Sequence, residues 1–167
     1  ETPIPLAPAT TETDTTAGER YLARYLDAFA PRALSGLHIG VYEHSAVIRD
    51  MLGAVLTRLG AKITPLARSA TFIPVDTEAV DPATRSALRT WASQHRLDAI
   101  VSADGDSDRP LVTDELGEVV PGDILGTLTA MFVGAGTVAT PVSSNSMVER
   151  CGAFAQVIRT RIGSPFV

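Results

Sequence analysis

The sequence predicts an α/β protein in which a mixed, mostly parallel sheet carries helices on both faces. Short apolar segments with strand character alternate along the chain with longer segments of helical periodicity, and this order is typical of parallel sheets. The chain has 167 residues, of which 45% are hydrophobic and 20% charged, so it can bury a substantial core. The alternation starts again after Gly134-Ala135-Gly136, which predicts a second, truncated domain of similar α/β type.

Five helices are expected where apolar residues recur three or four positions apart. Pro31 and Gly36 follow the first helix, and Gly60 ends the second, because proline and glycine stop or cap helices. Ser45 is expected to cap the second helix, and Pro82 suits the first turn of the third. In chain order the expected helices are 19–29, 46–59, 81–95, 121–133 and 146–154.

Six short strands are expected between or beside these helices. Each is a short, mainly apolar segment bounded by turn-forming residues. The segment 71–80 is an irregular polar and apolar mix around Pro74 and is expected to be a loop, and 115–118 is expected to be a turn. In chain order the expected strands are 37–42, 61–66, 98–103, 110–114, 137–141 and 156–160.

Three regions follow from this reading. Residues 1–18 contain several prolines and many threonines and are expected to be an extended linker. Residues 19–134 are expected to form the first α/β domain. Residues 135–167 hold too few elements to bury a sheet of their own, so they are expected to be part of a second domain.

Composition excludes several classes of protein. The net charge of −5 gives no general electrostatic case for a nucleic-acid partner. The single cysteine, Cys151, excludes an internal disulfide framework and fits a reducing cytoplasm. No apolar stretch approaches the length of a membrane span, and the N-terminus lacks the basic and apolar regions of a signal peptide. A cytoplasmic location without a membrane partner is expected.

The most informative segment is 104–109, with the sequence Asp-Gly-Asp-Ser-Asp-Arg, directly after the apolar segment 97–103. Three carboxylates this close repel one another and need a hard cation or cationic side chains beside them. The D-x-D-x-D spacing lets all three point toward one centre. Ligands of open α/β sheets bind at the carboxyl ends of strands, which is where this loop is expected to lie.

Three other interpretations of this loop stay open on the residues alone. A solvated acidic turn is the simplest. A calcium loop would use the three aspartates and Glu115, but it needs glycine where Arg109 stands, and its flanks should be helices. An aspartyl nucleophile of the haloacid-dehalogenase type also follows a strand, but it needs threonine or valine where Asp108 stands.

The segment 104–109 resembles the magnesium loop of the α-D-phosphohexomutases, the phosphomannomutase and phosphoglucomutase superfamily, whose signature D-G-D-x-D-R it matches at every fixed position. The resemblance extends over about residues 19–167. Further matching segments are PLVTDELGEVVPGDILG at 110–126, RTRIG at 159–163, and, as in a bacterial phosphomannomutase subgroup, VYEHSAVIRDML at 41–52 and FIPVDTEAV at 72–80.

The resemblance implies a set of roles. Asp104, Asp106 and Asp108 would each give one oxygen to Mg²⁺, the implied cofactor. Arg109 would act as the catalytic residue beside the transferring phosphoryl group, and Arg161 would reach the substrate or its phosphate. Enzymes of this family interconvert hexose 1-phosphate and hexose 6-phosphate through a phosphoserine and a bisphosphorylated sugar, and phosphoryl transfer depends mainly on positioning and charge stabilisation. The implied partners are the hexose phosphate and the other domains of the parent chain.

The chain also departs from the family pattern. It contains neither the S-H-N-P phosphoserine motif nor the G-E-x-S-G sugar loop, and Glu43-His44-Ser45 replaces the glycine-rich turn after the first strand of domain two. The chain is therefore expected to be a fragment covering domain two and part of domain three, inactive alone. The alternative is a stand-alone, non-catalytic metal-binding or interaction module. His44 is interpreted as a capping or loop histidine, and Glu78 as a residue of a solvated loop or of the interdomain cleft.

Overall fold

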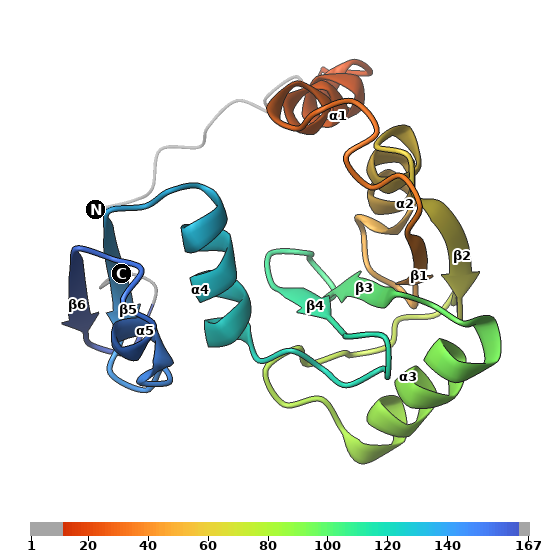
Figure 1. The fold of residues 1–167 in the computed structure, drawn as a ribbon. Coiled ribbons are helices and arrows are strands. Elements are labelled where there is room, and N and C mark those ends of the chain that lie inside the picture. Colours follow the sequence, from red (N-terminus) through yellow and green to blue (C-terminus); the bar gives the residue numbers. More distant parts are fainter. Residues whose placement is uncertain (1–11, 164–167) are drawn as a thin grey trace, which may run out of the picture.

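A four-stranded sheet lies at the centre of the chain in the computed structural model, which describes residues 12–163 (Figure 1). The strand order is β2-β1-β3-β4. β1 pairs in parallel with both β2 and β3, whereas β4 runs antiparallel to β3. This is the expected mixed, mostly parallel sheet. Its strands are β1 (His38–Tyr42), β2 (Lys62–Leu66), β3 (Ala99–Ala103) and β4 (Pro110–Val112).

Helices cover both faces of this sheet (Figure 1). α2 packs on β1 and β2, and α1 packs on α2. On the other face, Leu88 and Ala92 of α3 join Tyr42 and Ile100 of the sheet in the main hydrophobic core. Alternate strand residues point to opposite faces, so one strand can serve both helix layers. The helices are α1 (Ala17–Ala28), α2 (Arg49–Arg58), α3 (Pro82–His95), α4 (Gly122–Phe132) and α5 (Met147–Arg150).

A second, two-stranded parallel sheet follows α4. It consists of β5 (Thr137–Pro141) and β6 (Gln156–Thr160), joined through the single turn of α5. α4 contacts both β4 and α5 and lies between the two sheets in Figure 1. The expected second α/β unit is thus present. The domain boundary at 134–135 stays a prediction, and residues 1–11 of the expected linker lie outside the described residues.

The expected Ser45 cap is wrong. α2 begins only at Arg49, and Ile48 at its N-cap offers no side-chain hydrogen bond. The Ser45 hydroxyl is used elsewhere: it accepts from the Ile73 N–H at 2.8 Å and lies 3.2 Å from the Ile73 carbonyl. The Ile48 N–H donates instead to the hydroxyl of Ser107, 59 residues away, at 3.2 Å. A tertiary contact therefore replaces the local cap.

The helix expected at 146–154 is also wrong over most of its length, since only Met147–Arg150 is helical. Gly152 adopts a left-handed backbone with φ of 67°, a conformation typical of the residue that ends a helix. The Ala155 N–H then donates to the Gly136 carbonyl at 2.9 Å, which brings the chain alongside β5 and starts β6. The pairing of β6 with β5 therefore outweighs the helical periodicity of residues 146–154.

The start of α3 agrees with expectation, whereas β4 is shorter than expected. The Asp81 carboxylate caps α3 by accepting from the N–H groups of Ala83 and Thr84 at 2.9 and 3.0 Å. The strand expected at 110–114 ends at Val112. Among the described residues, no helix combines the length and apolar character needed to cross a membrane.

Candidate metal centre

The carboxyl ends of three parallel strands meet at one edge of the four-stranded sheet. The chain passes from β1 to β2 on one side and then crosses to β3 on the other side of β1. Crevices open at such switch points because the loops from neighbouring strands run in opposite directions. The acidic loop 104–109 follows β3 here, and Ala103, the last residue of that strand, is buried.

The loop brings Asp104, Asp106 and Asp108 together. One carboxylate oxygen from each lies within 4.8 Å of the other two. Asp104 is buried, whereas the other two are exposed. Mg²⁺ binds oxygen ligands at about 2.0–2.1 Å in an octahedron, so neighbouring ligand oxygens lie about 3 Å apart. The three carboxylates fit a hard divalent cation after a small contraction, because their oxygens are the ligands such ions prefer.

Arg109 supplies positive charge to this cluster. Its backbone N–H and its Nε donate to the two oxygens of Asp104 at 3.2 and 2.9 Å, and Nε also reaches Asp108 at 3.4 Å. Burial raises the pKa of Asp104, but the hydrogen bonds and charge of Arg109 outweigh it, and the pKa falls below its usual 3.8. Asp104 is therefore ionised at neutral pH, as a metal ligand must be.

The turn between β1 and α2 holds the acidic loop 104–109 through two hydrogen bonds from its backbone. The Val47 N–H donates to the Gly105 carbonyl at 3.2 Å, next to the bond from the Ile48 N–H to the Ser107 hydroxyl. Ser107 has a left-handed backbone with φ of 71°, which turns the loop so that its carboxylates converge. This role of Ser107 could not be predicted from the sequence, because its partner Ile48 is 59 residues away in the chain.

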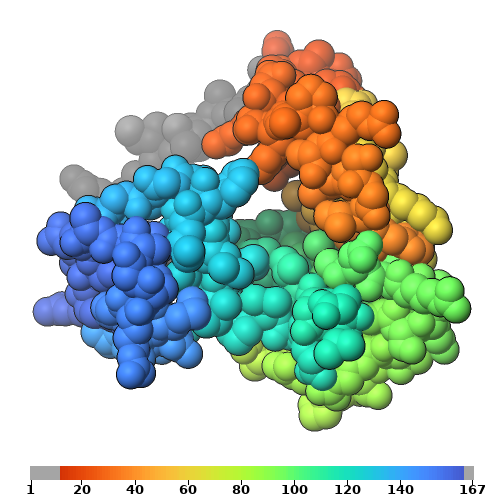
Figure 2. Space-filling view, viewed as in Figure 1, coloured from red at the N-terminus to blue at the C-terminus, as the bar shows by residue number. Residues whose placement is uncertain are grey.

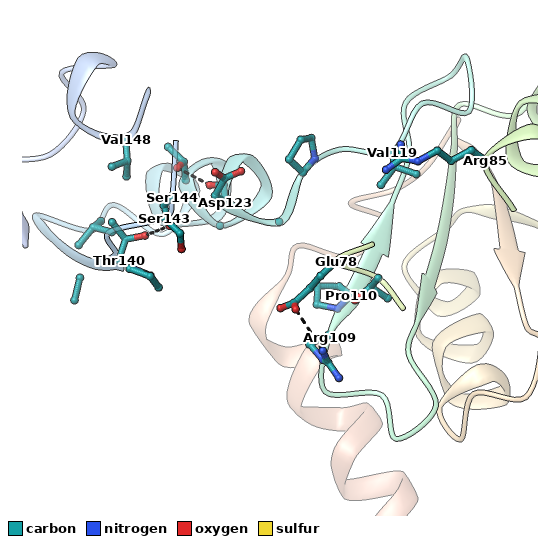
Figure 3. A pocket seen from close by; sticks show the side chains of 18 residues that line it. Glu78, Arg85, Arg109, Pro110, Val119, Asp123, Thr140, Ser143, Ser144 and Val148 are labelled. Carbon is teal, nitrogen blue, oxygen red and sulfur yellow. Dashed lines mark hydrogen bonds and ion pairs between the residues drawn. The ribbon is translucent and has the colours of Figure 1, made fainter. Parts of the chain in front are cut away.

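Arg109 also faces a pocket of about 880 Å³ between the two sheets. Figure 3 shows Arg109 and Glu78 on one side of it, joined by an ion pair of 3.6 Å, with Thr140, Ser143 and Ser144 on the other side. Figure 2 also shows the surface hollowed between the region of α4, in cyan, and the N-terminal part of the chain, in orange, although the residues that line this pocket all lie between 77 and 148. Glu78 lines this pocket while its side chain is 75% exposed, so its position fits both interpretations given for it, a solvated loop and a cleft.

Two arginines of the RTRIG segment at 159–163 differ in their surroundings: Arg159 lies in β6, and Arg161 follows it. Arg161 is exposed and is not among the described residues that line this cleft. Arg159, from the same segment, donates to the carbonyls of Pro141 and Ser144 at 2.9 Å and pairs with Glu149 at 2.6 Å. It therefore holds the turn that presents serine hydroxyls to the cleft. The RTRIG pattern pointed to this segment but not to this role.

Comparisons with known proteins agree with this architecture. No protein-family model matches the chain. It is 47% identical over 151 residues to a phosphomannomutase of Sinorhizobium fredii, covering 90% of this chain and 32% of that protein. It is 46% identical over 153 residues to a phosphomannomutase of Salmonella muenchen, covering 92% of this chain and 32% of that protein. The chain thus spans about one third of the length of these curated relatives.

Solved structures share its fold. A phosphoglucomutase/phosphomannomutase family protein from Burkholderia thailandensis superimposes with a TM-score of 0.70 at 16% identity, over 87% of this chain and 33% of that one. A protein described as a putative phosphomannomutase from Thermus thermophilus gives a TM-score of 0.70 at 21% identity, over 87% of this chain and 36% of that one. At these identities the likeness supports the arrangement of helices and strands.

Proposed function

The chain belongs to the phosphomannomutase/phosphoglucomutase family, and we propose that it supplies the magnesium-binding part of a hexose phosphomutase. The proposed parent reaction interconverts hexose 1-phosphate and hexose 6-phosphate by way of a phosphoserine and a bisphosphorylated sugar. One observation carries the proposal: three carboxylates converge in the loop after β3, in a chain 47% identical to a phosphomannomutase.

In this proposal Asp104, Asp106 and Asp108 hold Mg²⁺. When bound, the ion neutralises negative charge that develops on the phosphoryl oxygens during transfer. The buried Asp104 fixes one ligand direction, because Arg109 holds both of its oxygens. The exposed Asp106 and Asp108 complete the acidic face of the loop.

Arg109 is proposed to bind the transferring phosphoryl group. Its guanidinium lies between the carboxylates and the cleft, with Nη1 3.6 Å from Glu78. A planar guanidinium offers several fixed donors for phosphate oxygens and stays charged at any physiological pH. The hydroxyls of Thr140 and Ser144 across the cleft suit a sugar phosphate. Arg161 is proposed as a further phosphate contact on the family pattern alone.

We further propose that residues 19–134 form the domain with the metal loop and that 135–167 belong to the next domain. The hexose phosphate and the remaining domains of a longer parent protein are the proposed partners. The chain lacks the S-H-N-P motif that donates phosphate, so the chain alone is expected to convert no hexose phosphate.

A chimera tests this function. The matching 151-residue segment of the Sinorhizobium fredii phosphomannomutase is replaced by this chain, and conversion of mannose 1-phosphate to mannose 6-phosphate is followed with Mg²⁺ present. We expect an active chimera that Asp106→Asn slows by about 100-fold or more, because a catalytic metal contributes several kcal/mol. Asp27→Asn, on the exposed side of α1, is the matched control and should leave the rate unchanged. A folded chimera that binds Mg²⁺ without converting substrate would favour the non-catalytic module.

A further inference from the structure

We propose that His44 is a positioning residue for the metal loop, holding the peptide from which Asp104 extends. The inference rests on the proposed metal-binding function and names a residue beyond the ligands themselves. His44 follows β1, is 0% exposed, and comes from a different strand than the loop that it contacts. It is a loop histidine, as expected from the sequence, but a fully buried one whose ring contacts the strand that leads into the metal loop.

The His44 ring makes one direct contact with the strand that leads into the loop. Its Nε2 lies 2.7 Å from the carbonyl oxygen of Ala103. A carbonyl oxygen only accepts, so Nε2 carries a hydrogen and donates it. The other ring nitrogen, Nδ1, is buried and has no hydrogen-bond partner in the described part of the chain. Nε2 is thus the ring atom through which His44 holds the Ala103 carbonyl.

This hydrogen bond holds a peptide plane from one side while Arg109 holds it from the other. The Ala103 carbonyl and the Asp104 N–H belong to the same planar peptide group. The Asp104 N–H donates to the Arg109 carbonyl at 3.1 Å, while the Ala103 carbonyl accepts from His44. Fixing this plane limits rotation about the bonds of Asp104, so the direction of its buried carboxylate is set before any cation arrives.

The backbone of His44 is itself held in place. Its φ of 24° lies in the left-handed region, which is costly for a residue other than glycine and persists only where its surroundings impose it. Its carbonyl accepts from the Ser69 N–H and from Nη1 of Arg49, both at 2.9 Å. His44 thereby links the segments that follow β1, β2 and β3. A residue held this firmly can transmit the geometry of the sheet edge to the metal loop.

His38 provides a matched control. It is the first residue of β1, whereas His44 lies just beyond the last one, and its Nε2 also makes one hydrogen bond of 2.7 Å, to the Thr64 hydroxyl. A histidine that serves only the sheet should affect folding stability alone. A positioning residue should affect cation affinity as well.

The test measures Mn²⁺ affinity of the 167-residue chain by electron paramagnetic resonance, with urea unfolding as the readout of stability. His44→Asn tolerates the left-handed backbone but is too short to reach Ala103, whereas His44→Gln can place an amide N–H near the position of Nε2. We expect His44→Asn to weaken Mn²⁺ binding by about tenfold, in the range of other outer-shell partners of metal ligands. His44→Gln should recover most of this loss, and His38→Asn should leave the affinity unchanged.

The outcomes separate the two proposals. Equal Mn²⁺ affinity in wild type and Asp106→Asn would overturn the metal loop and the role of His44 together. Specific binding that is equally strong in wild type and His44→Asn would overturn the role of His44 alone, as would an equal loss in His44→Asn and His38→Asn. If His44→Asn does not fold, His44→Gln decides: near wild-type affinity supports the positioning role, and a tenfold loss despite a retained fold contradicts it.

Discussion

Replacing Asp104 by asparagine is expected to destabilise the chain by about 1.5 kcal/mol at neutral pH. The Asp104 side chain is 5% exposed, and its oxygens accept from the N–H and the Nε of Arg109 at 3.2 and 2.9 Å. The substitution keeps the size but turns one acceptor into a donor, which faces a donor of Arg109. Hydrogen bonds to charged groups contribute about 1.5–3 kcal/mol, and partial solvent screening of Arg109 favours the lower end.

The dependence on pH has a definite sign. Burial acts to raise the pKa of Asp104, but Arg109 lowers it more, so the folded-state pKa lies below the unfolded value of 3.8. A carboxyl shifted in this direction stabilises the folded chain above the unfolded-state pKa, and the contribution is lost as pH falls through the folded-state pKa. The difference between wild type and Asp104→Asn is therefore expected in full at pH 7 and should shrink below about pH 4.

Urea unfolding followed by Trp91 fluorescence at pH 7 and pH 3 provides the measurement, since Trp91 packs on the core. Asp106→Asn is the matched control: Asp106 is exposed, and removing its charge relieves repulsion within the cluster, so stability should stay unchanged or rise slightly. Both variants should lose Mn²⁺ affinity. Wild-type stability of Asp104→Asn at pH 7, or equal destabilisation by Asp106→Asn, would refute the reasoning.

Three further predictions concern the scaffold. Leu88→Ala, at a fully buried position of α3, should cost about 3 kcal/mol in urea unfolding, and a loss below about 1 kcal/mol would show that the site collapses around the cavity. Gly117→Ala should destabilise by more than about 1 kcal/mol because φ is 78° and the new Cβ would meet backbone at 2.6 Å, whereas Gly122→Ala meets nothing within 4 Å and should be tolerated. Ser107→Ala should weaken Mn²⁺ binding several-fold through the lost bond to α2, and unchanged affinity would exclude this role.

Local sequence signals predicted most elements because helix and strand periodicity depends on neighbouring residues. The sequence predicts that α3 starts at Asp81-Pro82, and the structure confirms this start; the Asp81 carboxylate accepts from N–H groups two and three residues further on. The Ser45 cap failed because Ser45 binds Ile73, a contact that exists only after the sheet forms. The helix expected at 146–154 failed for a similar reason, since pairing of β6 with β5 outweighs local periodicity.

The candidate site divides in the same way. The convergence of Asp104, Asp106 and Asp108 could be predicted because all three lie in one short loop. There the D-x-D-x-D spacing lets their carboxylates point toward one centre. The contact between His44 and Ala103 could not be predicted, because it depends on the pairing of β1 with β3 across 59 residues. The candidate metal ligands could therefore be predicted from the sequence, whereas the residues that orient them become evident only from the pairing of the strands.

The position of Arg109 has a consequence for cation affinity. A loop that satisfies Asp104 with an internal guanidinium does not need a metal to fold, unlike sites that form only when the ion binds. The same contacts lower the affinity for a cation, because the cation must compete with Nε of Arg109 for the oxygens of Asp104 and Asp108. Mg²⁺ also gives up its water reluctantly, and within residues 12–163 this loop offers it three carboxylates. We therefore expect weak binding by the chain alone, and a tight Ca²⁺ site in calorimetry would contradict the magnesium assignment.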